Sequence, residues 1–188
     1  MPETNKLARS LQELGLAAWF GGSLMGAIGV NGAAAQVQRE EERALVASAG
    51  WSRWTPVNLV AIGAYLTGST LVTVGNKSRI AGQKGVATTS VVKTSVIVAA
   101  LGATAYSRAL GQKVIKASPT PVSGGTEPTS GTPDEVADAQ RKLRMLQWAV
   151  PALTGTLVVL ASVMGEQQRA SQVASGVAQR ILPSALTR

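Results

Sequence analysis

The sequence predicts an all-α fold, a four-helix transmembrane bundle, and three observations support this prediction. Four apolar stretches are each close to the ~20 residues that an α-helix needs to cross ~30 Å of hydrocarbon. Charged residues make up only 15% of the 188-residue chain, against about 25% in soluble domains. Nearly all of these charges lie between the apolar stretches. The predicted spans cover residues 14–35, 56–75, 86–110 and 146–165.

The chain contains no cysteine and no histidine. Disulfides, thiolate nucleophiles, zinc sites built on these ligands and imidazole acid–base chemistry are therefore excluded. The remaining Glu, Lys, Tyr and Ser residues show no spacing that assembles a catalytic site. The sequence thus predicts a protein that is not an enzyme and that needs neither a metal nor a cofactor.

The net charge of +8 is carried by Lys and Arg residues in every loop. Because these cations do not gather on one face, they argue against nucleic-acid binding. Loops that lie against anionic lipid headgroups explain the excess better, since each cation near such a surface contributes about 1 kcal/mol. We therefore expect the lipid bilayer as a partner, and no nucleic acid.

The first span, residues 14–35, is rich in small residues. Gly22 and Gly26 form a small-xxx-small pattern, which lets helix backbones approach each other closely. Both glycines are therefore candidates for helix packing, within the chain or against a partner.

The same segment has a second interpretation. Cations at Lys6 and Arg9, an apolar run and the Ala-rich end at 33–35 together resemble a cleavable signal peptide. However, the apolar run is long for that purpose, and Glu13 lies at its start. An Ala-rich helix end is the favoured interpretation.

Residues 40–49 are good helix formers and should continue as a solvated helix outside the membrane. Trp51 and Trp54 are typical of an aromatic belt at the interface, and Pro56 suits the first turn of the second span. That span, residues 56–75, carries several hydroxyl side chains. They either bond to their own helix, which is the commoner case, or line a polar path.

The third span, residues 86–110, contains two cations. Lys93 lies about two turns inside it and Arg108 lies near its far end. Lys93 can reach the nearer interface, because helical side chains tilt toward the helix N-terminus. Alternatively it meets a buried partner or a ligand, as charges within membranes often do. Residues 111–133 are rich in Pro, Ser, Thr and Gly, and are predicted to be a disordered linker that buries no apolar surface.

Residues 134–165 are predicted to form an amphipathic lead-in that continues into the fourth span. Thr132 opens a capping box that is followed by proline at the first helical position. Pro151 should kink the span and Gly155 permits close packing there. Residues 166–188 predict an interfacial helix, with apolar residues on one face and arginines available for headgroups.

Four spans place both ends of the chain and the loop 77–84 on one face of the membrane. The cations near the span ends divide equally between the two faces, so the positive-inside rule does not choose an orientation. The loop 77–84 is the shortest and holds no acid, which favours cytoplasmic termini. We expect a multi-pass protein of the plasma membrane.

Three charges fall near the terminal face on three different helices: Glu13, Lys93 and Glu166. A pair between Lys93 and Glu166 would neutralise two groups at partial membrane depth. This cluster is the one candidate polar site that the sequence suggests, and three separately solvated charges are the alternative.

Five short runs are distinctive: AAWFGGSLMG at 17–26, WSRW at 51–54, NKSR at 76–79, WAVPALTG at 148–155 and GEQQR at 165–169. Together they resemble an uncharacterised family of small integral membrane proteins from high-GC Gram-positive bacteria such as actinobacteria. The resemblance implies four spans and a membrane location. It implies no activity, so it assigns no functional residue.

The expected function is that of a structural or accessory subunit, packing in a larger membrane complex or a homo-oligomer. The alternative is a small oligomeric transporter or lipid-handling protein. An accessory subunit should leave an apolar, glycine-lined face bare, whereas a transporter should direct polar residues from several helices into one cavity. An enzyme should instead show a pocket with clustered titratable groups.

Overall fold

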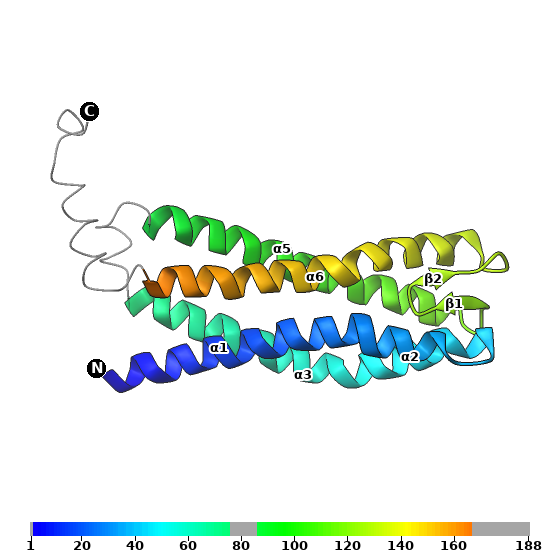
Figure 1. The fold of residues 1–188 in the computed structure, drawn as a ribbon, viewed down its shortest axis with the longest axis horizontal. Helices are drawn as coiled ribbons and strands as arrows, with labels where there is room; N and C mark the ends of the chain where they lie inside the picture. The colour runs from blue at the N-terminus through cyan, green and yellow to red at the C-terminus, as the bar shows by residue number, and fades with distance from the viewer. Residues whose placement is uncertain (1, 76–85, 167–188) are drawn as a thin grey trace, which may run out of the picture.

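The computed structural model describes residues 2–75 and 86–166. Helix α1 (Pro2–Met25), the π-helical turn η1 (Gly26–Val30) and helix α2 (Asn31–Ala35) follow one another without a break. Helices α3 (Glu40–Gly75) and α5 (Val86–Lys116) come next, then strands β1 (Val122–Gly124) and β2 (Glu127–Pro128), and finally helix α6 (Asp134–Glu166). The predicted all-α class is confirmed, apart from this small two-stranded sheet (Figure 1).

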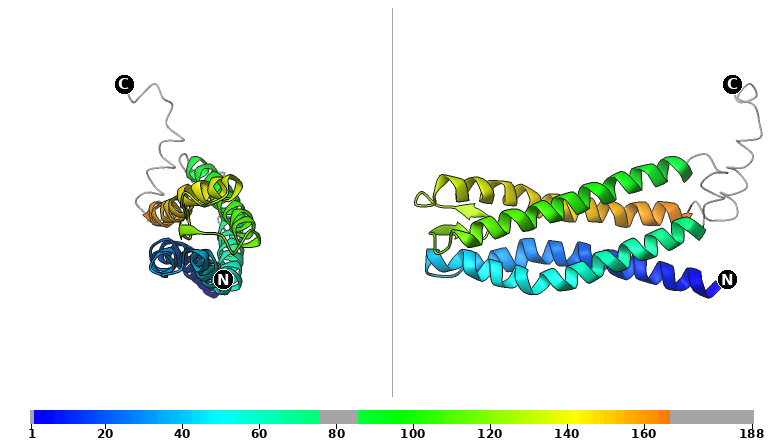
Figure 2. Two further views of the ribbon diagram at one scale, coloured as in Figure 1. Left: turned by 90° about the vertical axis from the view of Figure 1, so that its right-hand side faces the viewer. Right: turned by 180° about the vertical axis from the view of Figure 1, so that it is seen from behind.

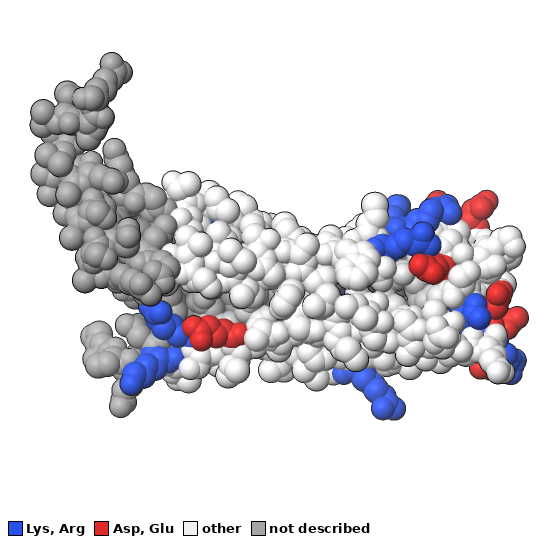
Figure 3. Space-filling model, in the orientation of Figure 1, with Lys and Arg blue, Asp and Glu red and all other residues white. Residues whose placement is uncertain are grey.

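Four helical segments are long and apolar enough to cross a membrane: Lys6–Ala35, Glu40–Gly75, Thr88–Lys116 and Asp134–Gly165. Their outer surfaces carry large apolar side chains, such as Val60, which is 73% exposed. Figure 3 shows charged side chains gathered toward the two ends of the bundle, with a wide uncharged band between them. This surface suits lipid, because an apolar face of such extent has no protein partner within the chain.

The helices pack as two antiparallel pairs. Helix α1 packs along α3, α5 packs along α6, and α1 also contacts α6, whereas α3 and α5 touch little. Seen from behind, α3 and α5 are the nearer helices (Figure 2). An apolar cluster around the fully buried Trp19, Tyr65 and Leu157 joins the two pairs.

The closest approach of α1 to α3 depends on two glycines. A Cβ at Gly15 would lie 2.5 Å from the backbone nitrogen of Tyr65, and a Cβ at Gly68 would lie 3.0 Å from the Cα of Gln12 and overlap the Ala8 carbonyl. Since the obstacles are backbone atoms, they cannot rotate away. These positions were not among the predicted packing glycines, yet they set the distance between the two helices.

Helix α3 differs from its prediction at its start. The solvated helix expected at 40–49 and the span expected from Pro56 form one helix, and Pro56 lies inside it. With 36 residues, α3 is about 54 Å long at 1.5 Å per residue. This exceeds the ~30 Å of hydrocarbon, so α3 is longer than a single membrane crossing requires.

The segment predicted to be a disordered linker, 111–133, is ordered, and that prediction is wrong. Helix α5 continues to Lys116, and residues 117–133 fold into a compact segment that we call the cap. In it, β1 and β2 pair antiparallel, with Val122 opposite Pro128. Val122 is 0% exposed and joins a second apolar cluster, with Val114 and Ala139 among its members. Composition suggested disorder, but the neighbouring helices supply an apolar surface on which the cap can fold.

The described ends of α1 and α6 lie at the same end of the bundle, opposite the cap (Figure 1), as the four-span layout requires. The predicted loop at 77–84 and nearly all of the predicted interfacial helix at 166–188 lie outside the described residues.

Candidate functional site

A cavity of about 380 Å³ lies inside the half of the bundle that ends at the cap. Its size is within the range of about 300–1,000 Å³ that is typical of small-molecule sites. It borders both apolar clusters, with Trp19 and Ile62 at one end and Val114 at the other. All four long helices contribute to the wall, and Gly125 and Thr126 of the cap close the far end.

Two tryptophans of α3 line the cavity and fill the space beside α1. The indole of Trp54 lies against Gly22 and the indole of Trp51 lies against Gly26, so that a Cβ at either glycine would overlap a ring. Each of the two predicted packing glycines therefore leaves room for an indole of the same chain. Gly155 of α6 packs less tightly, since its Cβ would lie 3.3 Å from the ring of Phe20.

A hydrogen-bond network joins four elements around the cavity. Trp51 Nε1 donates to Asn31 Oδ1 at 2.9 Å, and Asn31 Nδ2 donates to Gln147 Oε1 at 2.9 Å. Thr126 Oγ1 donates to the same Gln147 oxygen at 3.4 Å. The network thus ties α2, α3, α6 and the cap together and gives this part of the wall a polar surface.

The π-helical turn η1 keeps Asn31 directed inward. In an unbroken α-helix, the twelve-residue step from Trp19 to Asn31 would rotate the side chain by about 120° beyond three full turns. The wider π turn removes part of this rotation. As a result Trp19, Ser23, Ala27 and Asn31 are all buried. Such turns occur frequently at functional sites, which agrees with the position of Asn31 in the cavity wall.

Further polar groups lie closer to the core of the bundle. Trp19 Nε1 donates to Thr104 Oγ1 at 3.3 Å. Asn58 also lines the cavity, and its Oδ1 is buried without a hydrogen-bond partner among the residues that the structure describes. Leaving a buried amide oxygen unpaired costs about 1–3 kcal/mol. This oxygen has almost no accessible surface, so it is not available to a molecule in the cavity as the side chain stands.

Arg108 of α5 is the only ionisable residue in the described part of the cavity wall. With the amide of Gln112 turned so that its oxygen faces the guanidinium, that oxygen accepts from Arg108 Nη1 and Nη2 at 3.2 and 3.1 Å. None of the ion pairs formed between described residues includes Arg108. Because a guanidinium stays charged at any ordinary pH, the site carries one uncompensated positive charge.

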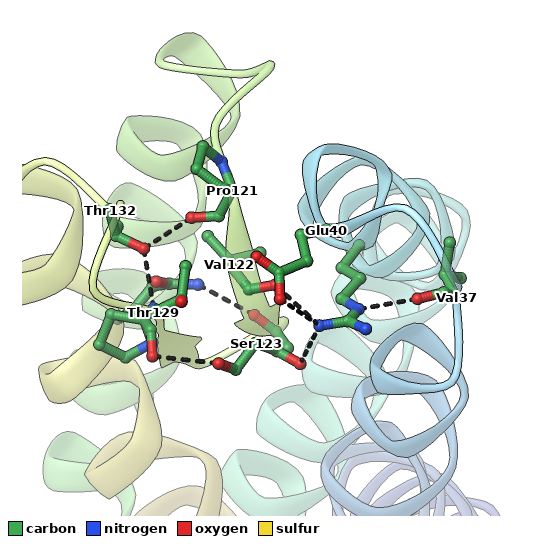
Figure 4. A network of polar contacts seen from close by, with 11 residues as sticks. Val37, Glu40, Pro121, Val122, Ser123, Thr129 and Thr132 are labelled. Carbon is green, nitrogen blue, oxygen red and sulfur yellow. Dashed lines mark hydrogen bonds and ion pairs between the residues drawn. The ribbon is translucent and has the colours of Figure 1, made fainter.

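Side chains from α3 and α6 hold the cap in place (Figure 4). Arg43 donates to the backbone oxygens of Val37, Val122 and Ser123 at 2.8, 3.3 and 3.4 Å. The fully buried Gln140 donates from Nε2 to the Gly124 oxygen at 3.0 Å.

Thr132 forms the turn that returns the chain to α6. Its Oγ1 donates to the Pro121 oxygen at 2.6 Å and accepts from the Thr129 N–H at 2.9 Å. Arg43 and Gln140 thus satisfy backbone oxygens of β1 and Thr132 closes the turn, whereas the buried Oε1 of Gln140 has no hydrogen-bond partner among the described residues.

The predicted polar cluster is not assembled among the described side chains. Lys93 is only 6% exposed, and its Nζ lies 5.9 Å from the centroid of the Tyr65 ring. The favoured interpretation, a side chain extended to the interface, therefore does not describe Lys93, because the π face of Tyr65 holds the ammonium inside the bundle. Glu13 is exposed and forms no ion pair with Lys93 among the described residues, and the side chain of Glu166 lies outside the described part.

Fold and cavity together define a class of protein: a bundle of four helices, each long and apolar enough to cross a membrane, around an amphipathic cavity closed at one end by an ordered cap. Comparisons with family models, with curated proteins and with solved structures gave no match. The resemblance to an actinobacterial family therefore stays a prediction.

The residues that matter most in the cavity were not singled out from the sequence. Asn31, Asn58 and Gln147 are amides within or beside apolar spans, and this would have been a usable signal because unpaired amides are costly there. No local pattern indicates that Thr126, which belongs to the supposed linker, reaches Gln147. That contact depends on the folding of the cap.

Proposed function

We propose that this chain handles lipids, binding an amphipathic, lipid-like molecule in the cavity of its bundle. One observation carries the proposal: polar side chains from α2, α3, α5 and α6 line a cavity that is otherwise apolar. Concave, mostly apolar sites with a few placed polar groups are the usual sites for such ligands. Lipid handling, which was the alternative function expected from the sequence, is thus favoured over the role of an accessory subunit.

The geometry gives less support to the other two functions. Gly22 and Gly26, which an accessory subunit could have used to bind a partner, are covered by indoles of the same chain. The cavity wall holds a single ionisable residue in its described part, whereas an enzyme of this composition needs a cluster of them. One observation favours an accessory role. Gly21 and Gly63 are exposed, and a Cβ added at either position would have no atom within 4 Å.

A lipid that co-purifies tests this proposal. We expect native mass spectrometry of the protein, purified in mild detergent, to show one bound lipid-sized adduct per chain. The Ala105→Phe variant places a ring at the cavity wall and should retain about tenfold less adduct, since overfilling a binding site excludes its ligand.

Ala109→Phe is the matched control, because Ala109 is exposed on the same helix but does not line the cavity. If the parent and both variants retain equal amounts of the lipid adduct, the lipid binds elsewhere. Absence of any adduct from the parent, together with a stably bound protein subunit, would favour the accessory role.

We also propose a multi-pass location in the plasma membrane, with the start of α1 and the end of α6 on the cytoplasmic side. The absence of native cysteine permits a clean test. Ser130 in the cap and Ser10 in α1 are both exposed and lie at opposite ends of the bundle. On intact cells, an impermeant maleimide should label Ser130→Cys and leave Ser10→Cys unlabelled until the cells are lysed. The reverse pattern would place the cap in the cytoplasm.

A further inference from the structure

The charge of the cavity wall indicates which amphiphile fits it, if the cavity binds lipid as proposed above. The described wall contains one cation, Arg108, and no carboxylate. At the same end of the bundle, five other cations are paired with acids within 4 Å, whereas Lys116, Lys142 and Arg53, like Arg108, form no ion pair among the described residues. These ion pairs are Arg39–Glu42, Arg43–Glu40, Lys113–Glu135, Arg141–Asp138 and Arg144–Glu127. Arg108 has only the neutral Gln112 beside it, so an anionic group on the ligand would provide the missing countercharge.

The exposed residues of the wall locate the opening. Leu59, which is 65% exposed, belongs to α3, and the exposed Ala105 and Arg108 belong to α5. Wall residues contributed by α1, α2, α6 and the cap are buried or half-buried. The cavity therefore opens along the seam where α3 and α5 touch little. The cap closes the end that faces water, so a ligand enters sideways from the bilayer.

The positions of the polar groups between the opening and the core fit a ligand whose polar head lies at the opening. Arg108 lies four residues from Thr104 on α5, a rise of about 6 Å, and Thr104 accepts from Trp19 near the core. Deeper in the bundle, Ile62 and Leu101 offer only apolar surface to the ligand.

We propose that the site takes an acidic amphiphile, which enters between α3 and α5 and places its anionic head on the Arg108 guanidinium. Its chain then lies toward Ile62 and Leu101. A phosphate or a carboxylate can supply the charge.

The tryptophans of the wall can report this binding. Trp19, Trp51 and Trp54 line the cavity, whereas Trp148 is 52% exposed on the outside and is best removed as Trp148→Phe. In dodecyl maltoside, the parent would be titrated with three amphiphiles that carry the same 9,10-dibrominated chain. These are a lysophosphatidic acid, a fatty acid and a neutral monoacylglycerol, and bromine quenches the fluorescence of nearby indoles.

We expect saturable quenching, with the lysophosphatidic acid binding about tenfold more tightly than the monoacylglycerol, as one charge-assisted contact would give. Arg108→Gln should remove this preference and leave binding of the neutral amphiphile unchanged. Arg53→Gln should have no effect, because Arg53 is an exposed cation of α3 that lies outside the cavity wall. The fatty acid should share the preference over the monoacylglycerol, and binding of both acids no tighter than the neutral probe would overturn the assignment of the anionic head to Arg108.

Two negative results have different meanings. Equal affinity for acidic and neutral amphiphiles in the parent, or an unchanged preference in Arg108→Gln, would overturn the headgroup assignment and leave the lipid site intact. Quenching by all three probes that never saturates, as for partition into the micelle, would instead overturn the proposed function itself.

Discussion

Replacing Gly68 with alanine is expected to lower the free energy of unfolding by about 3 kcal/mol, the upper range for overpacking a core. The added methyl group would overlap the Ala8 carbonyl and approach the Cα of Gln12 to 3.0 Å. Relief requires the backbones of α1 and α3 to separate, which also loosens the cluster around Trp19 and Tyr65. Thermal unfolding in detergent, followed by circular dichroism, measures the change.

Gly63→Ala is the matched control on the same helix, because nothing lies within 4 Å of a Cβ built there. Alanine has the better helix propensity, so Gly63→Ala should be neutral or stabilising by up to about 1 kcal/mol. If both variants unfold at the same temperature, the crossing of α1 and α3 at Gly68 is not as close as described.

Removing the Arg43 side chain is expected to release the cap from the bundle. Arg43→Ala deletes two hydrogen bonds to backbone oxygens of the cap, at about 1 kcal/mol each at most, so the cap should lose about 1–2 kcal/mol of local stability. Hydrogen exchange of amides in residues 117–133 should accelerate by roughly 5- to 30-fold, at 1.4 kcal/mol for each factor of ten.

Arg39→Ala provides the comparison. Arg39 contacts Glu42 at 2.9 Å in an exposed pair, and such pairs contribute about 0–1 kcal/mol. Exchange in the cap should then change little. Fast exchange throughout 117–133 in the parent protein would restore the prediction of a disordered linker.

The membrane-spanning class could be predicted because it depends on properties that each segment carries alone. Apolar runs of about twenty residues set the four spans, and four spans bring the described ends of α1 and α6 to one end of the bundle. The capping box at Thr132 likewise gave the start of α6 closely, since helix capping involves only neighbouring residues.

The candidate site could be predicted only in part. Gly22 and Gly26 were chosen correctly as close-packing positions, but the sequence does not indicate that indoles from α3 occupy the space beside them. Lys93 was recognised as an intramembrane charge, whereas its position over Tyr65 depends on how α5 crosses α3. Asn58 and Arg108 came together because helices far apart in the chain surround one cavity.

Hydropathy and helix signals along the chain thus account for the long helices and for their alternating direction in the bundle. The cap, the cavity and its single charge arise only in the tertiary structure. The physical reason is that local composition describes what a segment prefers by itself, whereas burial and hydrogen bonding depend on what other segments supply. Val122 shows the difference: in a Pro-, Ser- and Gly-rich run it has no local partner, yet α3, α5 and α6 enclose it completely.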